Sequence, residues 1–463
     1  MKPNFLVIQV DQLSERVLKK YNGTANTPNI DALIQEGIAF TNCVCQYPLC
    51  QPSRCSLWSG LYPHKTNVLS NGRNWPTEDI SKVIPTLGTI FKDNGYKTIH
   101  FGKKHDAGSL NGFECVPFDE EKIEPVSTAW PYNKDTYHDV FTTHKAVDFL
   151  SSYEFDEPLM MVVDLVNPHN ICGWIGENKG IHEDYPVSEL PELPPNFKFE
   201  DIQNRSKAIQ YICCSHNRQA QASGWNEDNY RHYLAAYYHY LSLVDSQIGS
   251  IIDKLKAVGQ KENTYIFLFS DHGDSITARG GVTKQVALYH ELVQVPLIVA
   301  GPKVPRGGAF VEGLAENIDI VPTLCDFANL KKAESFDGIS LKENILNLTK
   351  VNREYATSQW HTEWGYTVSP NRMIQTEEFK YIHYLEDNFE EFYDLKRDPY
   401  EMKNEIYNGK YKNEIEYMRN LFKKYLEESQ DNYFELEAKV APKWRQHKIG
   451  YHNHVGIAAP QEE

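Results

Sequence analysis

The chain has 463 residues, of which 41% are hydrophobic and 24% charged, and a formal net charge of −16 at pH 7. This length allows a large hydrophobic core and more than one domain, and the composition is typical of a soluble globular protein. The negative charge argues against nucleic-acid binding, because affinity for phosphates needs a basic surface. A small anionic substrate in a locally basic pocket remains compatible with it.

The N-terminus and the cysteines bear on where the protein works. Residues 1–5 lead directly into an apolar run, with no charged leader, long apolar stretch or small-residue cleavage site, and so show no secretory signal. No apolar run reaches transmembrane length. Nine cysteines without regular spacing are typical of cytosolic thiols. We therefore expect a cytoplasmic protein without a membrane partner, or a periplasmic or secreted one if the chain has been trimmed.

The first predicted element is a buried parallel strand over residues 4–10, which ends at Asp11 and Gln12. In open α/β sheets, ligands gather at the carboxyl ends of the strands. A carboxylate directly after the first strand is therefore well placed to hold a metal, although an aspartate there also commonly caps a following helix. The amide oxygen of Gln12 can ligate a hard cation but brings no charge.

A predicted helix and short strand over residues 27–42 lead to the segment Cys50-Gln51-Pro52-Ser53-Arg54. We expect a helix over residues 55–60, whose free N–H groups and dipole would favour an anion beside Cys50. Taken alone, Cys50 can equally be a small buried apolar residue and Arg54 a surface arginine.

Two further strands also end in polar residues. A helix over residues 84–96 and a strand over 97–101 precede Lys103 and His105, which can point from one loop into one pocket. A strand over residues 158–166 ends before His169. The polar stretch from 172 to about 222 is interpreted as a long excursion over the site rather than as core.

The next segment completes the predicted metal site. Residues 230–255 have helical spacing with aromatics expected to face the core, and a buried strand over 264–269 ends at Asp271 and His272. These two residues supply the second half of the site that Asp11 begins. The imidazole ligand suits zinc or iron better than calcium. Lys284 follows on a loop before a strand over 295–299.

From about residue 352 the pattern changes to short antiparallel strands, followed by a charged amphipathic helix over residues 405–430. We therefore predict a catalytic α/β domain over residues 1–350 and a C-terminal α+β subdomain over residues 351–463.

The Cys50 segment resembles the maturation signature of the type I, formylglycine-dependent sulfatases of the alkaline-phosphatase-like superfamily. Further family-like segments follow in order, so that the resemblance covers residues 4 to about 404: Gly102–His105, Pro168-His169, Asp271-His272 and Tyr393–Pro399. It implies a large mixed, mostly parallel sheet sandwiched by helices, with a smaller C-terminal antiparallel sheet plus helix. The chain departs from the commoner family pattern at Gln12 and His272, as do related hydrolases of phosphonate and phosphate esters.

The resemblance also implies a mechanism. A separate maturation enzyme would convert Cys50 to formylglycine, whose hydrated aldehyde attacks sulfur with one hydroxyl and expels sulfate with the other. The implied ligands of a divalent cation are Asp11, Gln12, Cys50, Asp271 and His272; we expect calcium first, with manganese, magnesium or zinc as alternatives. In the remaining implied roles, Lys103, Lys284 and Arg54 neutralise ester oxygens, His105 orients or deprotonates the nucleophile and His169 protonates the leaving group.

The expected substrate is a small sulfated saccharide, such as one derived from a glycosaminoglycan or mucin. The candidate sugar contacts are Asn71, Arg73, Trp360, His361, Glu363 and Arg372. One alternative is a phosphonate monoester or phosphodiester hydrolase with the same nucleophile, suggested by Gln12 and His272. A second is a non-catalytic glycan-binding relative. The sugar, the sulfated position, the metal and the oligomeric state stay open at this point.

Overall fold

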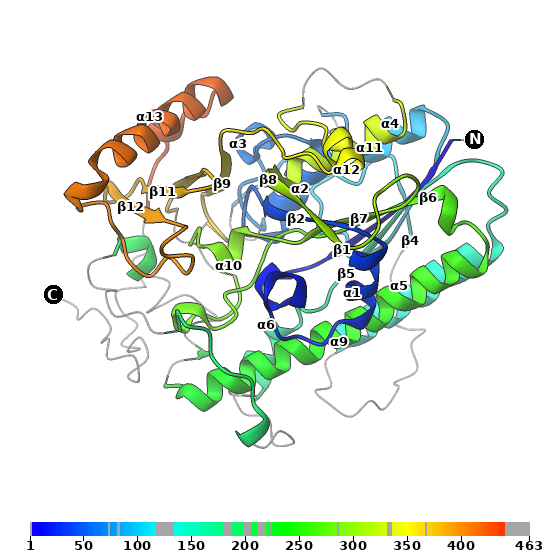
Figure 1. The fold of residues 1–463 in the computed structure, drawn as a ribbon, viewed down its shortest axis with the longest axis horizontal. Coiled ribbons are helices and arrows are strands. Elements are labelled where there is room, and N and C mark those ends of the chain that lie inside the picture. Colours follow the sequence, from blue (N-terminus) through cyan, green and yellow to red (C-terminus); the bar gives the residue numbers. More distant parts are fainter. Residues whose placement is uncertain are drawn as a thin grey trace.

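The computed structural model describes residues 2–72, 75–80, 84–116, 134–178, 187–197, 205–210, 219, 221–222, 224–284, 287–330, 336–365 and 368–439. These residues form one sheet of eight strands and a second sheet of four. Figure 1 shows the large sheet passing through the middle of the molecule, with helices on both faces and the small sheet at one end. The expected fold class, a mostly parallel sheet with a smaller antiparallel one, is confirmed.

The large sheet has the strand order β4-β3-β5-β1-β6-β7-β2-β8. In chain order its strands are β1 (Asn4–Val10), β2 (Gly37–Val44), β3 (Lys97–Gly102), β4 (Glu114–Val116), β5 (Leu159–Leu165), β6 (Thr264–Ser270), β7 (Leu297–Ala300) and β8 (Ala309–Glu316). Strand β7 runs antiparallel to both of its neighbours, β6 and β2. Strands β3, β5, β1 and β6 are consecutive and parallel, so their carboxyl ends meet at one edge of the sheet.

Helices cover the two faces of this sheet with separate hydrophobic cores. The α-helices of the described residues are α1 (Pro28–Glu36), α2 (Cys50–Ser59), α3 (Pro63–Thr66), α4 (Leu87–Asp93), α5 (Lys134–Ser152), α6 (Ile171–Asn178), α9 (Glu227–Ala257), α10 (His290–Val293), α11 (Ile320–Phe327), α12 (Lys342–Asn347) and α13 (Lys412–Ser429). Because side chains alternate along a strand, Phe5 and Val7 of β1 join the core under α2, α4 and α11. Leu6 and Ile8 face the core of α1, α5, α6 and α9, the helices below the sheet in Figure 1.

Two local predictions need correction. Helix α2 begins at Cys50, not at Cys55. Proline is tolerated in the first turn of a helix, where its missing N–H has no intrahelical partner to lose, so Pro52 does not delay the start. The stretch from 172 to about 222, expected to lie outside the core, includes most of α6, whose Trp174 is fully buried in the core beneath the sheet.

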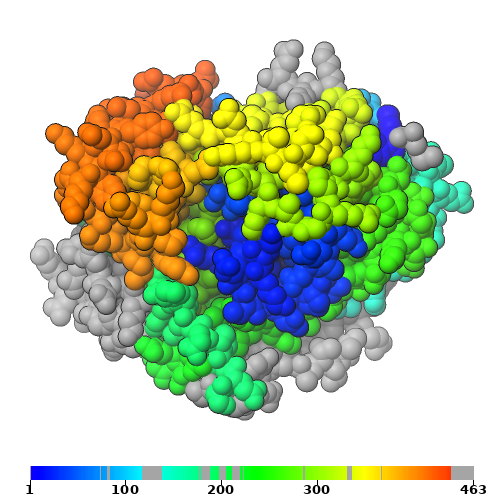
Figure 2. Space-filling model, viewed as in Figure 1, coloured from blue at the N-terminus to red at the C-terminus, as the bar shows by residue number. Residues whose placement is uncertain are grey.

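The small sheet comprises β9 (Ala356–Trp360), β10 (Asn371–Gln375), β11 (Phe379–Tyr384) and β12 (Phe389–Asp394), all antiparallel, as expected. Helix α13 packs on it, and Figure 2 shows this C-terminal part in orange as a lobe at one end of the molecule. One core cluster of the large sheet also includes Met373 and Ile382 of the small sheet. The boundary after residue 350 stays a prediction. Among the described residues, no helix is both long and apolar enough to span a bilayer.

Candidate active site

The carboxyl ends of the central parallel strands bring four charged side chains together. Asp11 follows β1, Lys103 follows β3 and Asp271 follows β6, while Asp164 is the penultimate residue of β5. These strands are neighbours in the sheet, and the crevice at such an edge is where ligands bind in open α/β folds. The sheet therefore gathers residues from positions 11 to 271 into one place.

Cys50 sits over this edge as the first residue of α2, where the helix dipole favours an anion. Its Sγ lies 3.7 Å from Asp11 Oδ1, 3.3 Å from His272 Nε2 and 3.6 Å from Lys103 Nζ. Four residues, Asp11, Cys50, Asp271 and His272, are all buried, and each offers a ligand atom within 4.8 Å of the others. We call these four possible metal ligands the cation cluster. Four of the five predicted metal ligands thus converge.

The donor set fits a divalent cation. His272 Nδ1 lies 2.9 Å from the carbonyl oxygen of Gly273, and because a carbonyl can only accept, Nδ1 carries the proton. In the neutral ring this leaves a lone pair on Nε2, the atom that faces Cys50. Burial lowers the pKa of His272, but Asp271 and Cys50 outweigh it and raise the pKa. The anionic surroundings that favour a proton there also favour a cation.

The fifth predicted ligand, Gln12, has a left-handed backbone with φ 68° and a side chain already engaged with the protein. Its Oε1 accepts a hydrogen bond from Lys284 Nζ at 2.7 Å, and its Nε2 donates to Asp274 Oδ2 at 2.5 Å. Its backbone N–H donates to Asp271 Oδ1 at 3.1 Å. The structure places Gln12 beside the cluster; its role as a metal ligand stays a prediction.

Arg54 is fully buried beneath the cluster and is bound by carboxylates. Its Nη2 donates to Asp11 Oδ2 at 2.8 Å and its Nε to Asp271 Oδ2 at 3.0 Å, while Nη1 donates to Asp164. We predicted contact between this guanidinium and the nucleophile or ester. Its three nitrogen atoms instead hold the two metal-site aspartates and Asp164, which favours a positioning role.

Cations gathered from distant segments set the charge state of the nucleophile. Burial alone would raise the pKa of Cys50, but Lys103, Lys284 and His272 lower it well below its usual value. Burial and Cys50 would likewise raise the pKa of Asp11, but Lys103 and other nearby cations hold it below its usual range. Lys103 Nζ lies 2.5 Å from Asp11 Oδ2. These cations therefore favour a negative charge at Cys50.

The two predicted histidines also reach the nucleophile. A side-chain hydrogen bond with His105 contributes to the lowered pKa of Cys50. Burial, followed by Lys284 and Lys103, lowers the pKa of His169 to about 4, while its contact with Cys50 acts in the opposite direction. His169 is thus a neutral imidazole near pH 7 and gains affinity for a proton when negative charge approaches.

The predicted sugar contacts divide into two groups. Asn71 Oδ1 accepts from the backbone N–H of Gln51 at 3.1 Å, and the Asn71 N–H donates to the carbonyl of Glu363 at 3.0 Å. Two predicted contacts therefore border the start of α2. His361 is also tied to this region, because its backbone N–H donates to the hydroxyl of Tyr47 at 2.8 Å. Arg73 lies outside the described residues.

The other group is packed into the protein. Trp360 is 2% exposed and lies against Tyr47, with ring centroids 5.2 Å apart. Arg372 is 2% exposed, and its Nε and Nη2 donate to Asp431 at 2.6 and 3.1 Å. Its Nη1 donates to the carbonyls of Trp360 and Asn371. A sugar contact by Arg372 conflicts with this placement, because its donors are committed to the interior.

Sequence reasoning missed three side chains that support the site: Asp164, Asp274 and Tyr233. Asp164 is the one acidic residue in the apolar run of β5, a signal that could have identified it. Asp274 lies in the segment that supplies Asp271 and His272. Tyr233 is buried in the core, as expected for the aromatics of this helix, and in addition its hydroxyl donates to Asp274 at 2.9 Å.

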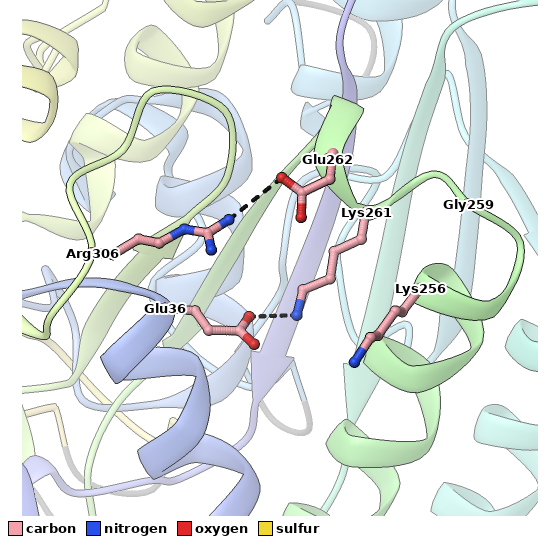
Figure 3. Close-up of a pocket in the computed structure, with 6 residues that line it drawn as sticks. All are labelled: Glu36, Lys256, Gly259, Lys261, Glu262 and Arg306. Atoms are coloured by element: carbon pink, nitrogen blue, oxygen red, sulfur yellow. Dashed lines mark hydrogen bonds and ion pairs between the residues drawn. The ribbon is translucent and has the colours of Figure 1, made fainter.

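A surface pocket of about 280 Å³ lies at the opposite, amino end of β6. Figure 3 shows two ion pairs across it, between Lys261 and Glu36 and between Arg306 and Glu262. Because both of its carboxylates already pair with cations and it lies away from Cys50, this pocket is not part of the candidate site.

Cys50 at the start of α2 and a group of possible metal ligands at the carboxyl edge of the sheet agree with the resemblance to alkaline-phosphatase-like hydrolases. A family model described as Sulfatase matches residues 3–330. A second, described as N-sulphoglucosamine sulphohydrolase, C-terminal, matches residues 281–431. The chain therefore belongs to the sulfatase family and is a sulfuric ester hydrolase. The family implies a formylglycine and a divalent cation, and the structure contains a cluster able to hold such a cation.

Individual relatives support this assignment over the full chain. A Delta 4,5-hexuronate-2-O-sulfatase of Bacteroides thetaiotaomicron is 42% identical over 464 residues, which cover 99% of this chain and 96% of the relative. The solved structure of a 2-O GAG sulfatase superposes with a TM-score of 0.92 at 42% identity, covering 99% of each chain. The phosphonate monoester hydrolase of Agrobacterium radiobacter has a TM-score of 0.75 at 23% identity, covering 91% of this chain and 95% of that one. That last likeness concerns the fold alone.

Proposed function

We propose that this sulfatase hydrolyses a sulfated saccharide, and that its substrate is the 2-O-sulfate ester of a Δ4,5-unsaturated hexuronate. The observation that carries the proposal is the full-length similarity to a sulfatase of that specificity, at 42% identity over 99% of this chain. The site agrees with it, because Lys103, Lys284 and the dipole of α2 favour negative charge at Cys50.

In the proposed mechanism, the chain's own residues hold the ester and move its protons. Lys103 and Lys284 bind the sulfate oxygens, whose charge is redistributed in the transition state. His105 orients the nucleophile. His169, which is neutral in the free site, would take up a proton when the anionic ester binds and pass it to the leaving oxygen, and general acid help of this kind contributes about 10²–10⁴-fold. Arg54 holds Asp11 and Asp271 in place.

We further propose that the cation is calcium and that Cys50 is converted to formylglycine by a separate maturation enzyme. The hard carboxylate oxygens of Asp11 and Asp271 suit calcium. The formylglycine, once hydrated, would supply the nucleophile. The cation would supply a Lewis acid that polarises this nucleophile and a sulfate oxygen. Mass spectrometry of the peptide that contains Cys50, and elemental analysis of the purified protein, test the two statements separately.

Sulfate release from defined saccharides tests the substrate. The enzyme, co-produced with a maturation enzyme, should desulfate an unsaturated hexuronate 2-O-sulfate and leave a 6-O-sulfated glucosamine unchanged. The Cys50→Ala variant should lose this activity, since it can form no aldehyde. Equal or faster release from the 6-O-sulfated sugar would contradict the proposed specificity.

Gln12 and His272 favour a second candidate, a phosphonate monoester or phosphodiester hydrolase that uses the same nucleophile. Gln12 removes one negative charge from the cluster, as the amide is neutral. An aryl sulfate and the matching aryl phosphonate share a leaving group, so their kcat/KM values compare the two functions directly. We expect the sulfate to be preferred; a clear preference for the phosphonate would select the second candidate.

A further inference from the structure

The side chain of Gln12 has only one orientation that satisfies both of its polar ends. Its Nε2 donates to Asp274 Oδ2 at 2.5 Å, and its Oε1 accepts from Lys284 Nζ at 2.7 Å. A reversed amide would point its NH₂ group at an ammonium and its carbonyl at a carboxylate, and both contacts would be repulsive. The acceptor Asp274 at one end and the donor Lys284 at the other therefore together determine which end of Gln12 faces Lys284.

Asp274 is fully buried and is itself held from two further directions. The hydroxyl of Tyr233 donates to its carboxylate at 2.9 Å, and the N–H of Ile276 donates to Oδ1 at 2.7 Å. The same Tyr233 hydroxyl accepts from the N–H of Thr283 at 2.8 Å, directly before Lys284. Asp274 is thus connected to Lys284 by two routes. One runs through the amide of Gln12, and the other through Tyr233 to the backbone of Thr283.

The loop between Asp274 and Lys284 needs such outside support. Ile276, Thr277 and Thr283 have φ values of 41°, 67° and 56°, in the left-handed region that β-branched residues rarely occupy. Their intrinsic preference opposes this conformation, so contacts from other elements must hold it. The hydrogen bond from the Thr283 N–H to Tyr233 of α9 is a contact of this kind.

We propose that Asp274 is a positioning residue that turns the amide oxygen of Gln12 toward Lys284 and the cation cluster, and thereby fixes the ammonium that grips the anionic ester. The proposal deepens the proposed sulfatase function and rests on it for its activity readout. Position 12 carries a neutral amide, and the carboxylate lies one hydrogen bond further from the cluster, at position 274. Asp274 acts through Gln12 and does not touch the substrate.

An exchange of the two chemical groups tests this proposal. In Asp274→Asn the new amide no longer repels a reversed Gln12, so only Lys284 still opposes the reversal, and the orientation of Gln12 is enforced from one side instead of two. In Gln12→Glu two carboxylates meet at hydrogen-bond distance and repel each other. In the double variant Gln12→Glu/Asp274→Asn the hydrogen bond returns with its direction reversed. The introduced asparagine donates it, and the introduced glutamate presents an oxygen to Lys284 whichever way its carboxylate turns.

The first readout is kcat/KM of the matured enzyme on a substrate that the unaltered enzyme hydrolyses. Each single variant should lose about 100-fold, the scale of a small misplacement of a catalytic group. The double variant should recover at least about tenfold over either single variant. Asp245→Asn is a control for loss of a buried carboxylate, since Asp245 binds the backbone of α1; it should lower stability without changing kcat/KM.

The second readout is the melting temperature of the unmatured, cation-free protein, which needs no activity. Both single variants should melt below the unaltered protein, and the double variant above both of them. An unchanged kcat/KM in Asp274→Asn would overturn the proposal. So would a double variant whose kcat/KM and melting temperature are both no higher than those of the poorer single variant. If Asp274→Asn does not fold, the comparison of Gln12→Glu with the double variant decides. An unaltered enzyme inactive on every sulfate ester would instead refute the proposed function and leave the melting test valid.

Discussion

Two buried arginines show that partners, rather than residue type, decide what a side chain does. Arg54 binds three carboxylates, two of which belong to the cation cluster. Arg372 binds the single carboxylate of Asp431 and stacks over Tyr433, with 4.8 Å between guanidinium carbon and ring centroid. Both were expected to contact substrate. Their surroundings indicate that Arg54 orders the active site, whereas Arg372 joins β10 to the segment after α13.

Replacement of Arg54 by lysine should cost both activity and stability. A lysine keeps the charge, but one ammonium cannot reach three carboxylates in the fork geometry of a guanidinium. We expect kcat/KM to fall by about 100-fold or more, comparable to loss of a preorganised electrostatic contact. Steady-state kinetics on a defined sulfate ester and thermal unfolding of the same sample measure the two effects.

Arg372→Lys is the matched variant for a purely structural arginine. It should lower the melting temperature, because the bidentate contact with Asp431 is lost. The KM of the folded enzyme should stay unchanged, since Arg372 is 2% exposed. A raised KM without loss of stability would restore the original assignment of Arg372 as a sugar contact.

Among the elements, α9 shows most clearly what sequence patterns can and cannot reveal. Its apolar and aromatic spacing predicted the helix, and the structure places it at Glu227–Ala257. The pattern did not reveal that Tyr233 and Tyr237, one turn apart, hydrogen-bond to Asp274 and to the carbonyl of Gln12. Periodicity reports which face is buried, whereas these hydroxyl partners depend on how distant strands end.

For the strands and the site as well, the sequence reveals burial and position in the sheet more readily than the partners of single side chains. Strands such as β1 and β6 were predictable because continuous apolar runs indicate burial on both faces. The convergence of Asp11 and Asp271 was predictable because parallel strands share a carboxyl edge, whereas the place of Cys50 beside them was implied by the resemblance to sulfatases. Asp274 was not identified, because it acts through another residue and shows no spacing of its own, whereas Asp164 did leave a signal as the one acidic residue in the apolar run of β5. Edge strands β4 and β8 were also missed.

The contact between α9 and α1 leads to a prediction at this scale. A Cβ added at Gly249 would lie 2.4 Å from Asn29 Oδ1, and Asn29 is held by Asp245 one turn earlier in α9. Gly249→Ala should therefore destabilise the protein by about 1–3 kcal/mol through overpacking. Urea unfolding followed by circular dichroism measures the loss.

Gly176→Ala is the control, because Gly176 also lies in a helix but its added Cβ would meet nothing closer than 3.5 Å. Alanine gains up to about 1 kcal/mol of helix propensity over glycine, so this variant should be neutral or stabilising. Equal effects of the two substitutions would show that α1 can shift to make room, and would contradict the close packing of α1 and α9.

At the scale of the whole molecule, a buried ion pair and a hydrogen bond join the small sheet to the start of α10. Lys380 of β11 pairs with Glu401, and both side chains are fully buried. Glu401 also accepts from the backbone N–H of His290 at 2.9 Å. The C-terminal strands therefore help to hold the start of α10 through Glu401.

Lys380→Met should destabilise the protein strongly, by about 3–5 kcal/mol, because it leaves the carboxylate of Glu401 buried without its main partner. Lys396→Met breaks a second lysine–glutamate pair, with Glu378, in which both side chains are largely exposed. That control should cost about 0–1 kcal/mol. Denaturant unfolding of the two variants measures the difference, and equal losses would show that the buried pair contributes no more than a surface pair.

Glu15, in the 3-10 helix Glu15–Val17, links stability to pH at the same junction. Burial raises the pKa of Glu15 to about 8, although Arg16 acts to lower it. Its Oε1 lies 3.0 Å from Nε2 of His290, whose pKa is lowered by burial and then by neighbouring cations. Both shifts favour a neutral pair. The folded protein thus keeps a proton on Glu15 that the unfolded chain, with a pKa near 4.5, has released.

Between about pH 4.5 and pH 8 the folded state therefore binds more protons at this position than the unfolded state, and stability falls as the pH rises. Glu15→Gln removes this contribution, of up to about 1.4 kcal/mol per pH unit, while the amide keeps the size of the protonated carboxyl group. The free energy of unfolding, measured from pH 5 to pH 8, should fall less steeply in this variant than in the unaltered protein. Glu262→Gln, at an 83% exposed side chain, should follow the unaltered curve. Parallel curves for Glu15→Gln and the unaltered protein would mean that Glu15 is ionised in the folded state and that His290 carries the matching positive charge.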